Sequence, residues 1–368
     1  MRPYVKVSRI VFNAVYRMRC ARAERRDEAV FLSRQTDSPS YDFSELAREF
    51  EERGWKVTMH LKKVRVRNLP AYVRHVLVEI GLLARCRVAV LDRYDPVVSL
   101  LDFECDAPCE SDAVNCEFPS RPLVLQLWHA FGAFKKFGYQ TNDTPEGHSF
   151  DFMRDYKIHR NYSWVVCSGE GCRAAFAEAF ACPVERVVAL RRPEYAELVA
   201  LREDARNRAK AHGRRKVLMA PTLRINDESA HPFRELYEHR AEFEGGIDAD
   251  VVWAFHPLED GLPAPGNVSD ALLDCDVVVT DYSSLVYEAY LLGKPAYFYV
   301  PDIDSYRVSP GVNFDPVELA PALCATTESE LAGLIAAGCY PTEEFEAFVA
   351  HAFDAPETPI ADFVLSKL

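Results

Sequence analysis

Short apolar runs rich in Val, Leu and Ile alternate with amphipathic stretches along most of the chain. Runs of this length predict strands, and the stretches between them, such as residues 43–54 and 284–293, predict helices. The first series of predicted strands covers residues 29–32, 56–60, 87–92, 123–128, 164–168 and 186–190. The second series covers residues 216–220, 250–255, 276–281 and 295–300.

This order predicts two parallel-sheet units. Strand and helix alternate in both series, which is typical of doubly wound α/β folds. A charged helical stretch, residues 201–215, separates the series and places the break near residues 191–213. We therefore expect an α/β protein of two doubly wound, Rossmann-like domains facing a central cleft, with residues 27–200 in the first and 201–368 in the second.

The first 26 residues differ in charge from the rest. They hold eight Lys or Arg against one acidic residue, a net charge of +7, which leaves −20 for residues 27–368 from a total of −13. Val7, Val11, Val15 and Met18 recur there at helical spacing. Two interpretations stay open, a helix that binds an anionic membrane surface and a helix that packs on the body and solvates its arginines. The acidic remainder argues against nucleic acid as the main partner.

The cysteines and the apolar runs indicate the compartment. Eleven cysteines lie scattered along the chain, which favours free thiols over a disulfide framework. Cys105, Cys109 and Cys116 lie in an acidic stretch without a nearby histidine, which disfavours a metal site. No apolar run reaches the roughly 18 residues of a membrane span, and no secretory signal is present. We expect a cytoplasmic protein and, if the N-terminal helix binds a membrane surface, one that is peripheral on the inner face of the cell membrane.

Polar residues collect just after four predicted strands, where parallel sheets bind ligands. The strands that end near residues 128, 220, 255 and 280 are each followed by groups able to bind phosphate or move protons. In chain order, these candidate residues are His129, Gly132, Lys135, Thr222, Arg224, His256, Pro257, Asp281, Tyr282, Ser283 and Ser284.

Each signal alone also has a structural explanation. The hydroxyls of "TDYSS" (280–284) could be a plain helix N-cap, and His129 and His256 could be hydrogen-bonded core histidines. "DID" (302–304) is too short to indicate a metal-bound nucleotide sugar. The chain lacks the G-x-G-x-x-G, P-loop and nucleophile-elbow patterns, which weighs against dinucleotide, P-loop and hydrolase chemistry.

The joint pattern is more specific. "LWHAFGAFKKFG", "APTLR", "FHPL" and "VVVTDYSSLVYEAYLLGKPAYFYVPDIDSYR" occur in that order at domain-scale spacing. Together they resemble the CDP-glycerol glycerophosphotransferase family of teichoic acid synthesis, over roughly residues 28–365. The resemblance implies a GT-B architecture. It also implies transfer of glycerol phosphate from CDP-glycerol to a hydroxyl of a lipid-linked acceptor, with release of CMP.

Two departures from the family pattern bear on the substrate. The family commonly has W-H-G-T-P-x-K, whereas residues 128–135 read WHAFGAFK. The family's arginine-glycine pair is also interrupted, since Arg307 is followed by VSPG. A different polyol, such as ribitol, or a different acceptor is compatible with these changes.

The resemblance and the chemistry together assign roles. His129 is the expected general base, since imidazole titrates near neutrality. A protonated His256 offsets charge on the diphosphate or assists the leaving CMP. Thr222, Ser283 and Ser284 match the family's phosphate-binding hydroxyls.

Further roles complete the expected donor site. Arg224 and the helix end at Ser283 hold the diphosphate, and Glu288 is a candidate for the ribose hydroxyls. No cofactor or tightly bound divalent metal is expected there. Two alternatives remain, a GT-B glycosyltransferase that uses a nucleotide sugar and a non-catalytic membrane-associated protein with the same fold.

Overall fold

The computed structural model describes residues 2–63, 68–103, 122–145, 147–211, 213–224, 230–259, 261–264, 266–337 and 339–368. Cys105, Cys109 and Cys116 lie outside the described residues. The remaining eight cysteines are free thiols, as expected. Among the described residues, no helix is both long enough and apolar enough to cross a membrane.

The first unit contains a parallel sheet in the order β2-β1-β3-β4-β5-β6. Its strands are β1 (Arg26–Ser33), β2 (Lys56–Leu61), β3 (Cys86–Leu91), β4 (Leu123–Gln126), β5 (Trp164–Cys167) and β6 (Val187–Ala189). Alternate residues of β1 enter different cores. Ala29 and Phe31 face one side of the sheet, and Val30 and Leu32 face the other. Burial on both faces explains the continuous apolar runs of these strands.

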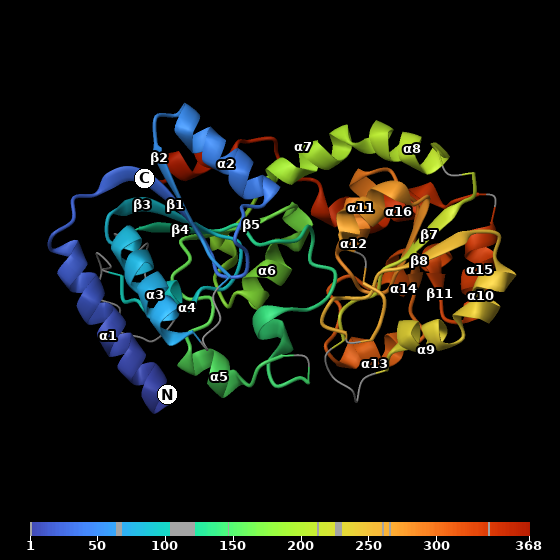
Figure 1. Ribbon diagram of the computed structural model, residues 1–368, viewed down its shortest axis with the longest axis horizontal. Coiled ribbons are helices and arrows are strands. Elements are labelled where there is room, and N and C mark those ends of the chain that lie inside the picture. Colours follow the sequence, from blue (N-terminus) through green and yellow to red (C-terminus); the bar gives the residue numbers. More distant parts are fainter. Residues whose placement is uncertain are drawn as a thin grey trace.

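Helices cover both faces of this sheet (Figure 1). They are α1 (Pro3–Cys20), α2 (Tyr41–Glu52), α3 (Leu69–Leu83), α4 (Pro96–Leu100), α5 (Phe150–Asp155) and α6 (Arg173–Ala179). Two further helices, α7 (Pro193–Ala200) and α8 (Arg202–Ala211), lead across to the second unit and lie over both units in Figure 1.

The second unit contains a parallel sheet in the order β11-β10-β9-β7-β8. Its strands are β7 (Lys216–Met219), β8 (Asp250–Trp253), β9 (Val277–Thr280), β10 (Ala296–Tyr299) and β11 (Cys324–Ala325). Its helices are α9 (Pro232–Glu238), α10 (Arg240–Gly246), α11 (Val268–Asp274), α12 (Leu285–Leu291), α13 (Ile303–Val308), α14 (Pro316–Leu319), α15 (Glu328–Ala336) and α16 (Thr342–Val349).

The prediction of two parallel-sheet α/β units is confirmed, and each of the ten predicted strands is present. The two-residue strand β11 was not predicted, because so short a segment has no period. The last helix, α17 (Ile360–Leu365), packs on the first sheet, beside α2. The chain therefore returns to the first unit at its end, whereas the predicted second domain ran to residue 368. The domain bounds themselves stay a prediction.

The loop after β4 joins the two units. Phe134 is buried, and its ring centroid lies 5.2 Å from that of Phe348 and 5.6 Å from that of Phe298, both in the second unit. The side-chain amide of Asn313 donates to the backbone oxygens of Ala133 and Lys135, at 2.9 and 3.2 Å. An aromatic side chain and a set of backbone hydrogen bonds thus fasten one unit to the other.

Gly132 makes this contact possible. Its φ of +62° lies in the left-handed region that favours glycine. A Cβ atom at this position would lie 2.2 Å from Cζ of Tyr287, on α12 of the second unit. Gly132 therefore serves the close approach of the two units, and a side chain here would separate them.

We predict that Phe134→Ala lowers the free energy of unfolding by about 3–5 kcal/mol, because it leaves a cavity where the two units meet. Urea denaturation followed by fluorescence measures this change. Phe150→Ala, at a residue that is 48% exposed, is the matched control and should change stability little. Equal denaturation midpoints for the two variants would contradict the assigned role of Phe134.

Candidate functional site

His129 stands just beyond the carboxyl end of β4. The chain turns there, since Trp128 has a φ of +60° and its ring stacks on Phe137 at 5.1 Å. The Nδ1 atom of His129 lies 3.4 Å from the backbone oxygen of Asp92. A carbonyl oxygen only accepts, so this contact assigns the proton to Nδ1 and leaves the lone pair on Nε2. The ring is thus held in the tautomer that a general base needs.

Positive charges surround this histidine. Its side chain reaches solvent, but protein atoms enclose the ring on the other sides. Desolvation lowers the pKa of His129, and the charges of Arg93, Arg192 and Lys135 lower it further. His129 is therefore neutral at physiological pH and lies among cations suited to an anionic substrate, but its pKa in the free protein is about 3, below the near-neutral value expected from the sequence.

His129 opens into a cavity of about 300 Å³ in the first unit. Aromatic rings, histidines and other polar side chains line this cavity, which suits a polar organic substrate. The lining residues are Gln35, Arg93, Tyr94, Trp128, His129, Gly138, Thr141, Gly147, His148, Met153, Ile158 and His159.

Arg192 links this region to the second unit. It is buried and ion-paired with Asp42 through Nε and Nη2, while its Nη1 atom has no hydrogen-bond partner. Burial and the neighbouring Glu194 raise the pKa of Glu288 to about 7, and Arg192 opposes this rise. Arg192 thus acts on both His129 and Glu288, which belong to different units.

Sequence reasoning missed Arg192, and with it Asp92 and Arg93. Asp92 ends the predicted strand 87–92, and Arg93 and Arg192 follow the predicted strands 87–92 and 186–190, so all three lie at the same edge of the first sheet as His129. The signal was therefore present. None of the quoted motifs includes these residues, and an arginine after a strand is too common to indicate a site by itself.

In the second unit, Asp281 joins the ends of β7 and β9. Its Oδ1 atom accepts from the backbone N–H groups of Thr222 and Tyr282, both at 2.7 Å. Its Oδ2 atom accepts from Arg224 at 3.0 Å. All three donors are within hydrogen-bond distance of a carboxylate that is only 1% exposed. Asp281 therefore holds this strand edge in place.

Arg224 is enclosed by carboxylates. Besides Asp281, it contacts Asp302 through Nη1 at 2.6 Å, and its guanidinium lies 4.9 Å from the ring of Tyr306. Two carboxylates thus balance its charge without a substrate. The Oγ1 atom of Thr222, in contrast, is buried without a hydrogen-bond partner. Of these two groups, the threonine hydroxyl is the one ready to donate a new hydrogen bond to an anionic oxygen.

His256 and Pro257 are exposed in the turn after β8. The backbone N–H of Leu258 donates to Nδ1 of His256 at 3.2 Å, which leaves Nε2 to face solvent. Glu259 accepts from the backbone N–H of His256 at 3.3 Å and lines a small cavity with Thr222 and Asp281. The turn that carries His256 is thus tied to the region around Asp281.

The remaining predicted residues make different local contacts. Ser283 accepts from the N–H of Leu285 at 3.3 Å at the start of α12, whereas Ser284 makes no capping bond. Lys135 pairs its backbone with Val312 in an isolated antiparallel bridge. Arg307 is ion-paired with Asp304 and Asp315, at 2.9 and 2.6 Å.

The structure brings Thr222, Arg224, Asp281 and Tyr282 into direct contact. His129 and Glu288 share the neighbourhood of Arg192. His129 and His256 belong to different units, and within the described residues no contact joins them. The candidate site therefore consists of two clusters, one at the strand ends of each sheet.

Comparison with known proteins identifies the family. The family model described as CDP-glycerol:poly(glycerophosphate) glycerophosphotransferase matches residues 14–354. The chain belongs to this family. The match spans all four quoted motifs and confirms the resemblance predicted from them.

Two curated relatives come from Bacillus spizizenii. A teichoic acid poly(ribitol-phosphate) polymerase is 31% identical over 268 residues, which cover 67% of this chain and 43% of the polymerase. The chain thus spans less than half of that relative's length. A teichoic acid ribitol-phosphate primase is 26% identical over 408 residues, with 97% of this chain and 96% of the primase covered.

Solved structures support the fold. A structure of the wall teichoic acid polymerase TagF has a TM-score of 0.64 and 16% identity, and the match covers 98% of this chain and 94% of that one. A UDP-GlcNAc 2-epimerase from Methanocaldococcus jannaschii has a TM-score of 0.52 and 11% identity, with coverage of 92% and 99%. Both likenesses concern the arrangement of the two units.

We predict that Arg93→Gln raises the pKa of His129, because it removes the cation that most strongly lowers it. The pKa of His129 should then rise toward the ordinary imidazole value of about 6.5. NMR titration of the imidazole, assigned with His129→Ala, measures the shift. Arg87→Gln, at a residue that pairs with Asp27 on the surface, is the control and should leave the titration unchanged. A lower pKa in Arg93→Gln would contradict this electrostatic account.

Proposed function

We propose that this protein is a CDP-polyol phosphotransferase of teichoic acid synthesis. It transfers polyol phosphate, either glycerol phosphate or ribitol phosphate, from the CDP-polyol to a hydroxyl of a lipid-linked acceptor and releases CMP. The observation that carries the proposal is the state of His129. It is a neutral imidazole with a free Nε2 among Arg93, Arg192 and Lys135.

In the proposed reaction, Nε2 of His129 takes the proton of the acceptor hydroxyl as that oxygen attacks the polyol-bearing phosphorus. The bond between this phosphorus and the CMP oxygen breaks, and CMP leaves. Negative charge on the transferred phosphoryl oxygens is stabilised by the cations near His129. Desolvation first, and the charges of these cations second, lower the pKa of His129 and keep the base unprotonated before the substrate binds.

The second unit supplies the donor site in this proposal. Thr222, with its unpartnered hydroxyl, and Ser283 and Ser284 bind the diphosphate. His256, whose Nε2 faces solvent, contacts the leaving nucleotide. Arg224 acts as a positioning residue, since its bonds to Asp281 and Asp302 fix the edge that presents Thr222. Glu288 binds the ribose hydroxyls, and Tyr282 and Arg307 support the same edge.

The relatives bear on the choice of polyol. The ribitol-phosphate primase matches this chain almost from end to end, whereas a glycerol-phosphate primase of Bacillus subtilis is 23% identical over 273 residues. This difference supports ribitol phosphate as the preferred group. The loop at residues 130–134 departs from the family pattern, which is consistent with a changed substrate.

We predict that His129→Ala lowers turnover by about 100-fold or more, the share that a general base supplies, and leaves donor binding nearly unchanged. CMP release is measured with CDP-ribitol and CDP-glycerol in the presence of a lipid-linked acceptor, and donor affinity is measured by calorimetry. His239→Ala, at an exposed histidine of the second unit, is the control. Turnover of His129→Ala near the wild-type rate would refute the proposed base.

The same proposal places the enzyme on the membrane. Helix α1 packs on the body through Val5 and Tyr16, yet Val7, Ile10 and Val11 on its outer side are 59%, 61% and 51% exposed. Neighbouring α3 adds Val73, which is 46% exposed. One face of α1 therefore packs on the body, and the other face presents apolar side chains beside arginines, as a membrane-binding helix would. The packing and the membrane-binding interpretations of this segment each describe one of its faces.

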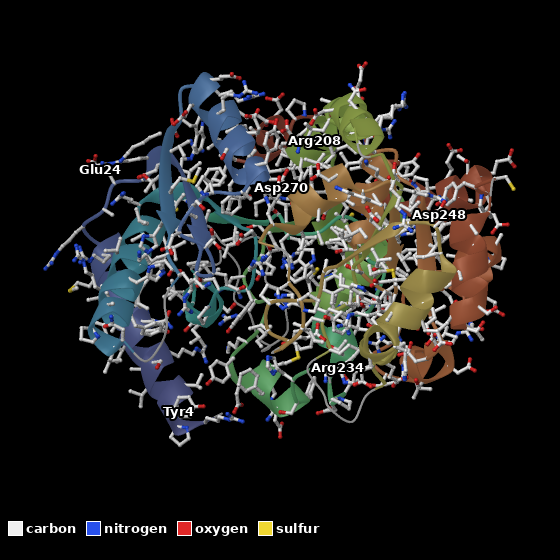
Figure 2. The ribbon with its side chains drawn as sticks, turned by 45° about the vertical axis from the view of Figure 1, so that its right-hand side comes forward. Tyr4, Glu24, Arg208, Arg234, Asp248 and Asp270 are labelled. Carbon is white, nitrogen blue, oxygen red and sulfur yellow. The ribbon has the colours of Figure 1, made fainter. Side chains whose placement is uncertain are left out.

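The position of α1 is consistent with such a role. It forms the outer side of the first unit in Figure 1. Figure 2 shows Tyr4 of α1 on the opposite side of the molecule from Asp248 of the second unit. An anionic bilayer would attract the segment of charge +7 by roughly 1 kcal/mol for each Lys or Arg near the surface and repel the acidic remainder. We propose that this face contacts the membrane.

We predict that Val7→Glu with Val11→Glu weakens binding to anionic vesicles by about tenfold or more, because it removes apolar contact and adds charge. Both side chains are exposed, so the fold should survive. Sedimentation with vesicles measures binding, and Val308→Glu, at a residue that is 84% exposed in the second unit, is the control. Wild-type sedimentation of the double variant would show that α1 serves only to pack on the body.

A further inference from the structure

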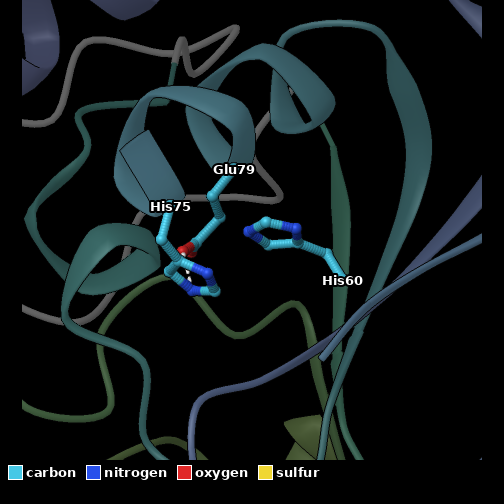
Figure 3. Close-up of side chains that lie close together, drawn as sticks. All are labelled: His60, His75 and Glu79. Atoms are coloured by element: carbon cyan, nitrogen blue, oxygen red, sulfur yellow. Dashed lines mark ion pairs between the residues drawn. The ribbon is translucent and has the colours of Figure 1, made fainter. Parts of the chain in front are cut away.

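A second cluster of ionisable side chains lies in the first unit, on β2 and α3 (Figure 3). His60 belongs to β2, the edge strand of the sheet, and His75 and Glu79 lie one turn apart on α3. One donor atom from each side chain lies within 4.8 Å of the other two. The side chains converge from two elements, whereas surface ionisable groups usually diverge into solvent.

The cluster is buried but lacks the hydrogen bonds that burial requires. Glu79 is fully buried and His75 is 6% exposed. Both carboxylate oxygens of Glu79 and the Nε2 atoms of His60 and His75 have no hydrogen-bond partner. Unpaired buried polar groups are unfavourable, since they lose their contacts with water. Three side chains whose ligand atoms lie this close together, with buried nitrogen and oxygen atoms that no hydrogen bond satisfies, indicate a ligand that they share.

The distances fit a metal ion. Tetrahedral zinc at its usual ligand distances sets neighbouring ligand atoms about 3.3–3.6 Å apart. Nε2 of His75 and Oε2 of Glu79 are 3.6 Å apart. The rings of His60 and His75 stack with centroids 4.1 Å apart, so metal binding requires the His60 ring to turn out of this stack and direct its nitrogen lone pair at the ion. Two imidazoles and one carboxylate are a ligand set that zinc accepts.

We propose that His60, His75 and Glu79 bind a divalent transition-metal ion of the zinc class. Nothing in the proposed transfer reaction requires this ion, and its site shares no lining residue with the cavity at His129. Asp95 lies close enough to raise the pKa of Glu79, and one of its oxygens is also unpartnered. A second carboxylate beside the cluster adds to its attraction for a cation.

The ion would keep a coordination position open. His60 and His75 line a pocket of about 740 Å³, whose charged lining also comprises Lys62, Lys63, Arg74 and one carboxylate, Asp37, which is ion-paired with Lys62. Three protein ligands with an open fourth position are typical of zinc sites that bind a further molecule. The cationic lining makes an oxyanion, such as a phosphate group, the chemical class that suits this position.

A metal-free arrangement is the competing explanation. Burial, and then the charge of Asp95 and a hydrogen bond that its carboxyl group can share with Glu79, raise the pKa of Glu79 well above its ordinary value, so a protonated Glu79 could hydrogen-bond to Asp95 or, after a small movement, to His75. In that case Glu79→Gln would preserve the interaction, because an amide also donates. The two explanations therefore differ in what zinc does and in what this variant does to zinc binding.

The test uses the full chain without a histidine tag, stripped with chelator and titrated with zinc chloride by calorimetry. We expect one zinc ion per chain. Glu79→Gln and His60→Ala should each weaken binding by more than the roughly 10–100-fold that loss of an outer-shell partner costs. His239→Ala is the matched control and should bind as the wild type does.

Metal content after gel filtration and circular dichroism of each variant complete the experiment. Stoichiometric zinc in the wild type and in His239→Ala, with its loss from folded Glu79→Gln, supports the site. No saturable zinc binding by the wild type overturns the proposal, as does zinc binding of equal affinity in Glu79→Gln and His60→Ala.

Discussion

The insertion of the loop after β4 into the second unit is the contact on which the arrangement of the site depends. Phe134 lies among aromatic rings of the second unit, and Asn313 binds the backbone on both sides of it. His129 lies only five residues before Phe134. Because the same short loop carries both residues, the contact between the units also fixes where the base stands.

The charges of the site follow from this arrangement. In the second unit, Asp281 and Asp302 neutralise Arg224, so the strand edge is rigid before a substrate arrives. In the first unit, Arg192 is ion-paired with Asp42 and Glu194, but its Nη1 atom keeps a donor without a partner, and Arg93 and Lys135 add positive charge near His129. One cluster thus provides a fixed frame, and the other provides the charge that an anionic substrate needs. This division is consistent with a donor held by one unit and a base held by the other.

Much of this architecture could be predicted from the sequence. The apolar runs predicted ten strands because a strand buried on both faces leaves a continuous apolar segment. The placement of α17 on the first unit could not be predicted, because the pattern of Ile360–Leu365 specifies a buried face but not its partner. The motifs located Thr222 and Asp281 at the strand ends. They did not show that carboxylates already balance Arg224, which depends on Asp302, 78 residues further along the chain.

The two groups that sequence reasoning missed have different causes. Arg192 follows a predicted strand but belongs to no quoted motif, and its importance comes from Glu288 on the other unit. His60 precedes His75 by 15 residues in a stretch without a zinc-type spacing, and Figure 3 shows that strand and helix bring them together. In both cases the decisive proximity is created by the fold.

The central claim is that the polyol-bearing phosphorus moves from the nucleotide to the acceptor. Phosphorus NMR combined with chromatography of the nucleotide product tests this most directly, with the protein, CDP-ribitol or CDP-glycerol, and a lipid-linked acceptor. The account predicts one CMP for each new phosphodiester, with the second phosphorus of the donor in the acceptor product. Release of CDP, with both phosphorus atoms still on the nucleotide, would contradict it.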